Sequence, residues 1–209
     1  MAAAEPPASQ RPFAEYRLPR GRHGIPPELV AENQRWRLLG ACAEVLAERG
    51  YAHTTSADVA DGAGVSRSTF YRYFGDLDAC ALAAFELAAG CLWDVVSGAC
   101  EGAGERPARL RAAIDAALEF FAAEPALAHL LGAETPAGVP AIADARAQLI
   151  ARLAKLPAAA AERPPSSRDR HLVSATFALV SNRLATGDTA GLPALAPDLT
   201  ELLAGAAKS

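Results

Sequence analysis

The sequence has little that would place the protein in a membrane or in an export pathway. A spanning helix needs about 20 mainly apolar residues, yet the most apolar stretch, 79–96, contains Glu86 and Asp94. The N-terminal residues MAAAEPPASQ lack the basic start and the apolar stretch of a signal peptide. We therefore expect 79–96 to be a buried helix and the protein to be cytoplasmic.

Cysteine is scarce, and its spacing does not predict a metal site. The 4 cysteines form no CxxC pair and have no histidine at zinc-ligand spacing: Cys42, Cys80, Cys91 and Cys100. We expect reduced, buried thiols, with thiol-based redox sensing as an alternative. No metal and no cofactor is predicted.

Aromatic residues are also few, at 6% of the chain, and alanine is abundant, which favours helices over sheets. No stretch has the alternation of a half-buried strand. The sequence lacks a nucleophile–base pair, paired carboxylates and a phosphate-binding loop, so we do not expect an enzyme. The predicted fold class is all-α.

The helical patterns divide the chain into three segments. Residues 1–24 predict a flexible basic arm, 25–76 predict a compact three-helix unit, and 77–209 predict a larger helical domain. Loop-forming stretches divide the last segment into these expected helices: 77–102, 106–122, 125–131, 140–156, 168–186 and 195–207.

Capping residues mark the helices of the middle segment. Thr55 followed by Asp58 is a capping pattern, and Ser66 and Asp76 precede the next two helices. Gly64 falls in the short connection, where a positive φ is often needed. Residues 56–74 therefore predict a helix-turn-helix, whose second helix enters the major groove of DNA in proteins that use the motif.

The second helix of this motif has hydrogen-bond donors over its first two turns. Arg67 suits guanine edges, Thr69 suits a thymine methyl or a phosphate, and Tyr71 suits a phosphate. The alternative is a solvated helix face that contacts no nucleic acid.

The stretch TTSADVADGAGVSRSTFYRYFGDLDAC resembles the DNA-binding signature of the tetracycline-repressor (TetR) family of bacterial transcription regulators. The resemblance implies a three-helix helix-turn-helix DNA-binding domain over 25–76, a helical ligand-binding and dimerisation domain, and a homodimer on a palindromic operator. Leu77 departs from the pattern, because many members carry a phosphate-contacting lysine there. The candidate DNA contacts of the motif are Thr55, Ser56, Arg67, Ser68, Thr69, Tyr71, Arg72 and Tyr73.

A basic segment precedes this unit, although the net charge of the chain is −4. Its Pro-Arg-Gly-Arg sequence is similar to the core of AT-hook segments, which place arginines in a narrow minor groove. We expect Arg20 and Arg22 to reach the minor groove and Arg17 to contact the backbone; an idle tail is the alternative. Arg35 and Arg37 could add phosphate contacts, or form solvated ion pairs.

In two expected helices near the C-terminus, apolar residues recur at three- and four-residue spacing. This pattern predicts a narrow apolar seam along each helix, suited to helix packing. In the TetR family the last two helices commonly form the dimer interface, although an internal core seam gives the same pattern. The candidate interface residues are Val173, Phe177, Val180, Leu184, Leu199 and Leu202.

Bulky residues of the middle helices are candidates for an effector pocket, or plain core: Phe85, Trp93, Phe120, Phe121 and His129. Low aromatic and polar content points to an apolar effector.

These features predict a ligand-responsive DNA-binding regulator, most simply a repressor that a small molecule releases from its operator. A helical small-molecule-binding protein that retains the helix-turn-helix as a scaffold is a further alternative.

Overall fold

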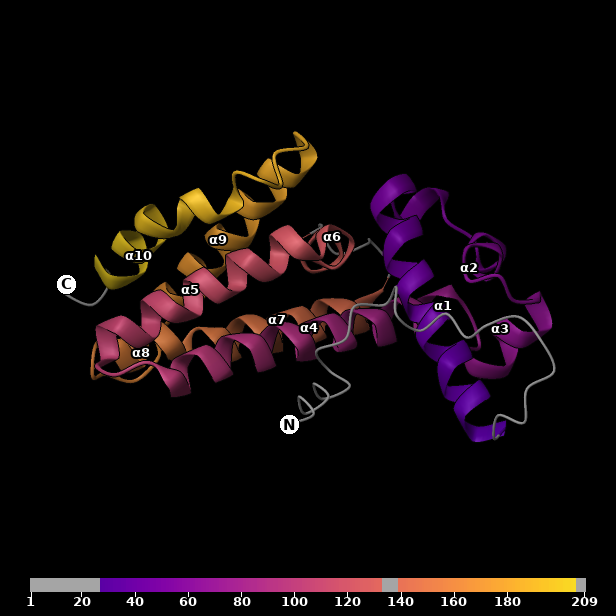
Figure 1. Ribbon diagram of the computed structural model, residues 1–209, viewed down its shortest axis with the longest axis horizontal. Coiled ribbons are helices and arrows are strands. Elements are labelled where there is room, and N and C mark those ends of the chain that lie inside the picture. The colour runs from indigo at the N-terminus through magenta and orange to yellow at the C-terminus, as the bar shows by residue number, and fades with distance from the viewer. Residues whose placement is uncertain (1–26, 133–138, 206–209) are drawn as a thin grey trace, which may run out of the picture.

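The computed structural model describes residues 27–132 and 139–205, and these form helices and turns without a strand. Helices α1 (Pro27–Arg49), α2 (Ser56–Gly62) and α3 (Arg67–Tyr73), with the 3-10 turn η3 (Tyr51–His53), make up one end of the molecule (Figure 1). The other helices form an elongated bundle: α4 (Leu77–Gly102), α5 (Arg106–Ala123), α6 (Pro125–Gly132), α7 (Pro140–Leu153), α8 (Lys155–Ala160), α9 (Ser167–Ala185), η4 (Leu192–Leu195) and α10 (Ala196–Gly205).

The predicted all-α fold is confirmed, and one expected helix is interrupted. The sequence pattern predicts a helix over 140–156, but α7 ends at Leu153 and α8 begins at Lys155. Pro157 lacks a donor N–H, and its ring collides with the carbonyl four residues earlier in a continuous helix. Residues 157–160, expected in a loop, are therefore helical in a separate element.

Helix α4 connects the two parts of the molecule and runs along the bundle (Figure 1). It begins after Asp76, whose Oδ1 accepts a hydrogen bond of 2.8 Å from the Ala79 N–H. By length and composition alone α4 could span a membrane. Phe85, Leu92 and Val96 are buried, so α4 is a core helix of the bundle.

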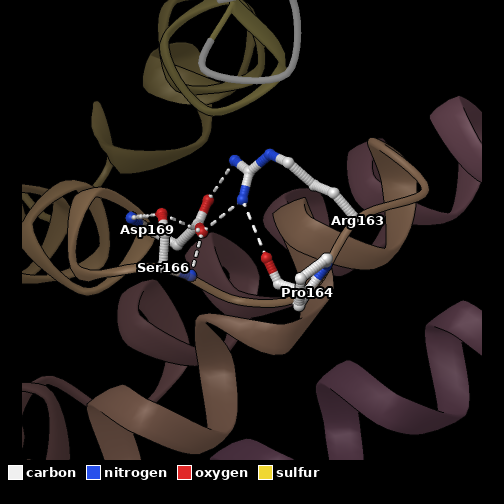
Figure 2. Close-up of polar contacts among 4 residues, drawn as sticks. All are labelled: Arg163, Pro164, Ser166 and Asp169. Carbon is white, nitrogen blue, oxygen red and sulfur yellow. Dashed lines mark hydrogen bonds and ion pairs between the residues drawn. The ribbon is translucent and has the colours of Figure 1, made fainter.

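A buried ion pair fixes the turn before α9. Figure 2 shows Arg163 donating two hydrogen bonds of 2.7 Å to the Asp169 carboxylate, which also accepts from the Ser166 N–H and hydroxyl at 2.7 Å each. Asp169 is fully buried, and the adjacent guanidinium holds the pKa of its carboxyl well below the usual range. This end of the bundle is therefore held by directional polar contacts.

Candidate DNA interface and effector cavity

A complete capping box holds the N-terminus of α2. The Asp58 N–H donates to Thr55 Oγ1 at 3.3 Å, and the Thr55 N–H donates to the Asp58 carboxylate at 2.9 Å. Arg49 Nη1 lies 2.8 Å from the same carboxylate. Hydrogen bonds from Thr55 and the charge of Arg49 lower the pKa of Asp58. Thr55 thus acts as a cap, and Ser56 beside it opens the helix.

The turn between α2 and α3 has the predicted left-handed residue. Gly64 has a φ of +62°, a region that favours glycine. The Gly64 N–H donates to the Asp61 carbonyl and the Val65 N–H donates to the Ala60 carbonyl, both at 3.0 Å. The chain therefore enters α3 from a hydrogen-bonded turn.

Hydroxyl groups cluster at the N-terminus of α3. Ser66 Oγ accepts from the Thr69 N–H at 3.1 Å and lies 2.8 Å from Ser68 Oγ and 2.9 Å from Thr69 Oγ1. These side chains cap the helix at the end that a helix-turn-helix presents to base edges.

Three of the predicted DNA contacts point outward from α3. Tyr71 is 57% exposed, and its ring packs edge-on against buried Phe70 at 5.4 Å between centroids. Arg67 and Arg72 are exposed. Within the described part of the chain, neither arginine has a hydrogen bond or an ion pair. The outer face of α3 can therefore offer two cations and a phenol to a ligand.

Tyr73 is directed inward instead. Its side chain is half-buried, and its hydroxyl donates to Gln34 Oε1 of α1 at 3.1 Å. The hydroxyl proton that a phosphate contact would need is already engaged. The Tyr73 hydroxyl is therefore not placed as a free hydrogen-bond donor to a DNA phosphate.

Arg37 has a similar internal role, which the sequence pattern did not indicate. Its Nη2 donates to the carbonyls of Ala63 and, at 3.4 Å, of Gly64. Arg37 thus makes a contact within the protein, whereas Arg35 is exposed. No local signal links residues that lie 26 positions apart.

Leu77 and its two acidic neighbours have structural partners. Leu77 is half-buried against the core, and Asp76 caps α4. The Asp78 carboxylate accepts from the Tyr51 hydroxyl; burial and this hydrogen bond raise the pKa of Tyr51. Arg17, Arg20 and Arg22 lie outside the described residues, so the minor-groove arm remains a prediction.

A cavity of about 70 Å³ lies between α4, α5, α9 and α10 and the junction of α7 with α8. Its wall is hydrocarbon apart from Thr176, whose Oγ1 donates to the Leu172 carbonyl at 3.1 Å. The wall contains no charged side chain and is formed by Leu92, Val96, Leu110, Ala113, Ile114, Ala117, Leu118, Phe121, Leu153, Leu156, Pro157, Val173, Thr176, Phe177, Leu199 and Leu203.

Of the five predicted effector-binding residues, the cavity contains Phe121 alone. Phe85 belongs to the buried core, and Phe120 packs edge-on against Phe121 at 5.8 Å. The Trp93 ring is covered by the Arg152 guanidinium at 3.8 Å from the ring centroid. Those outside the cavity wall are Phe85, Trp93, Phe120 and His129.

The candidate dimer seam is also largely internal. Five of its six residues are buried by the chain's own helices: Val173, Phe177, Val180, Leu184 and Leu199. This arrangement corresponds to the internal core seam, because a side chain enclosed within one chain cannot also face a second copy. Leu202 is 40% exposed on α10, and Leu179 of α9 is 45% exposed.

Three cysteine thiols lie in environments that disfavour the reactive thiolate. The hydrogen bond with Cys42 and burial raise the pKa of Cys80, and burial raises that of Cys91 and Cys100. Among the described residues no group of three His, Cys, Asp or Glu side chains could hold a metal ion.

Known proteins are similar to this chain both in the helix-turn-helix unit and in the helical bundle. Residues 38–84 match the model of bacterial regulatory proteins of the tetR family. No curated protein matches the chain significantly. The fatty acid degradation regulator FadR from Bacillus halodurans has a similar structure, with a TM-score of 0.69, 20% identity, and coverage of 88% of this chain and 97% of that one.

Two further solved structures are similar over most of their length. FadR from Bacillus subtilis, in complex with stearoyl-CoA, has a TM-score of 0.64 at 19% identity, covering 80% of this chain and 96% of that one. A TetR-like regulator from a Rhodococcus species has a TM-score of 0.65 at 23% identity, covering 92% and 100%. At these identities the likeness concerns the fold. The helix-turn-helix geometry and the family match together show that residues 38–84 belong to a DNA-binding domain of the TetR family of transcription regulators.

Proposed function

We propose that the protein is a cytoplasmic homodimeric repressor that binds a palindromic operator and leaves it when an apolar molecule enters the cavity. The observation that best supports this proposal is the hydrocarbon wall of the cavity, to which α4 contributes side chains. Helix α4 begins at Leu77, shortly after α3 ends at Tyr73, and places Leu92 and Val96 in the wall. Expansion of the cavity therefore displaces the helix on which the recognition unit is mounted, and so couples the two sites.

The composition of the wall favours a long alkyl group as the bound part of the effector. Burying an unpaired charge there is strongly unfavourable, whereas each buried CH₂ contributes about 0.8 kcal/mol. The structurally similar FadR in complex with stearoyl-CoA supports a fatty acyl thioester. A stearoyl chain needs more space than about 70 Å³, so we expect the cavity to enlarge on binding.

The exposed leucines of the last two helices support dimerisation. Leu179 and Leu202 are exposed on α9 and α10, which lie side by side in the bundle (Figure 1). A dimer would cover them and present two recognition helices to a palindrome. We expect L179E/L202E to be monomeric in sedimentation experiments, whereas A151E, an added acid on exposed α7, stays dimeric. A dimeric double variant would exclude this face.

The proposed function is tested by selecting genomic fragments with the purified protein and then adding stearoyl-CoA. We expect enrichment of a palindromic duplex, binding of one dimer per duplex, and release by stearoyl-CoA. Failure to enrich any duplex would contradict the operator, and persistent binding at saturating stearoyl-CoA would contradict the effector class.

A further inference from the structure

The geometry points to Arg37 as a positioning residue for operator binding: from α1 it holds the turn that leads into α3, and Gln34 holds the far end of α3. The inference rests on the proposed function, because it takes α3 as the helix that reads the operator. It assigns to α1 the task of setting the angle at which α3 is presented.

The first contact lies at the end of α2. Arg37 Nη2 donates to the carbonyls of Ala63 and Gly64, which follow the last residue of α2. The C-terminus of a helix has unpaired carbonyls and a partial negative charge, and a guanidinium is always charged. Arg37 therefore acts as a C-terminal cap supplied by another helix.

Gly64 makes this approach possible. A Cβ on residue 64 would lie 2.7 Å from Arg37 Nη2, and the φ of +62° is unfavourable for other residues. Because the glycine leaves this space open, the guanidinium reaches the backbone of the turn itself. The turn and α1 are thus directly connected.

The second contact lies at the end of α3. The Tyr73 hydroxyl donates to Gln34 Oε1 at 3.1 Å. Gln34 and Arg37 are three positions apart on α1 and therefore share a face. One face of α1 therefore holds the chain before α3 and at its end, and Phe70 of α3 is itself fully buried. Two separated polar contacts restrict rotation of α3 relative to α1.

The Arg37 guanidinium lies away from part of the predicted DNA interface. Helix α2 has 7 residues and a length of about 10 Å, and the guanidinium lies at the opposite end of α2 from Thr55 and Ser56, two of the predicted DNA contacts. Arg35 provides a contrasting comparison, because it is an exposed arginine on the same helix and a candidate phosphate contact.

The experiment compares R37M, R35M and Q34M on two probes: the duplex enriched by the wild-type protein from a random library, and a scrambled duplex of equal length. R37M should weaken binding to the enriched duplex about tenfold, the order of one lost base contact, with little change on the scrambled duplex. The salt slope should not change, because no phosphate contact is lost. Q34M should show the same pattern to a smaller degree, and R37K should recover part of the affinity.

Other results overturn the proposal. An equal loss on both probes with a salt slope smaller by about 1 would make Arg37 a phosphate contact. Unchanged binding by R37M, or by R37Q if R37M does not fold, would exclude positioning. If the wild-type protein enriches no duplex, the operator proposal fails separately. Hydrogen exchange on the free protein then decides: the amides of Gly64 and Val65 should exchange faster in R37M than in R35M, and equal rates contradict the inference.

Discussion

The two ends of the molecule are stabilised in different ways. Helices α2 and α3 have 7 residues each, too few to be stable alone, and each is held by a side-chain cap. Helix α4 has 26 residues and α5 has 18, and the space between α4, α5, α9 and α10 is closed by hydrocarbon packing. Directional hydrogen bonds define one geometry for the DNA-binding unit. Apolar packing is non-directional, and it permits the cavity to change size.

The largest effect should come from removing one buried side chain in each region. F70A and L118A both truncate fully buried residues, and each should cost roughly 2–5 kcal/mol of unfolding free energy. Only F70A should also abolish binding to the enriched duplex, because Phe70 anchors α3. Urea unfolding and anisotropy measure the two quantities. Equal losses of duplex binding would remove the distinction between the regions.

The Arg163–Asp169 pair tests a polar site of the bundle in which the carboxylate is fully buried. D169N should lower the unfolding free energy by about 1–3 kcal/mol at pH 7, because Asp169 is buried and its charged hydrogen bonds are lost. D115N affects an exposed pair with Arg111 and should cost less than about 0.5 kcal/mol.

The pH dependence of the same pair has a defined sign. The pKa of Asp169 in the folded protein is lowered, so its contribution is present above the unfolded value of about 3.9 and is lost as pH falls toward the folded pKa. Wild-type stability should therefore decline more steeply below pH 4 than that of D169N. Parallel acid profiles in urea would contradict the role of the pair.

On the outer face of α3, substitutions should distinguish a contact with a base from a contact with the DNA backbone. R67A should relax preference at one base pair by about 1–3 kcal/mol, whereas Y71F should weaken binding on all sequences alike. Affinities on a panel of single-base variants of the enriched duplex measure both. The same loss on every sequence for both variants would show that Arg67 does not read a base.

The smallest effect is expected at Thr176, the polar residue in the cavity wall. T176V keeps the shape and removes a hydroxyl that already donates to the Leu172 carbonyl. Acyl thioester affinity should change by less than about threefold, since only an acceptor is lost. A tenfold loss in calorimetry would mean that a polar group of the effector binds inside the cavity.

The features that were predicted correctly are local ones. Thr55, Ser66 and Asp76 cap their helices as expected, because a cap is decided within three residues. The Arg37 contact was not predictable, since it joins residues 26 positions apart. Helical spacing showed that Val173 and Phe177 share a face, but it does not specify whether the same chain or a second copy covers that face.

The location of the cavity was the feature least predictable from the sequence, for a related reason. Its wall combines side chains from several helices, and most are ordinary leucines and alanines that have no individual signal. Bulky aromatics were a poor guide because such residues fill space: Phe85 is core, and Trp93 pairs with Arg152. The apolar character of the cavity was predictable from composition, but its location among the helices was not.

The most direct test of the central claim is release from the enriched duplex by coenzyme A thioesters of increasing chain length, from butyryl to stearoyl. A117F fills the cavity, and A116F adds the same ring at a neighbouring half-buried position outside the wall. For wild type and A116F, the concentration needed for release should fall by up to roughly fourfold per added CH₂. A117F should bind the duplex normally and resist release. Release that is independent of chain length, or equal in A116F and A117F, would contradict control through this cavity.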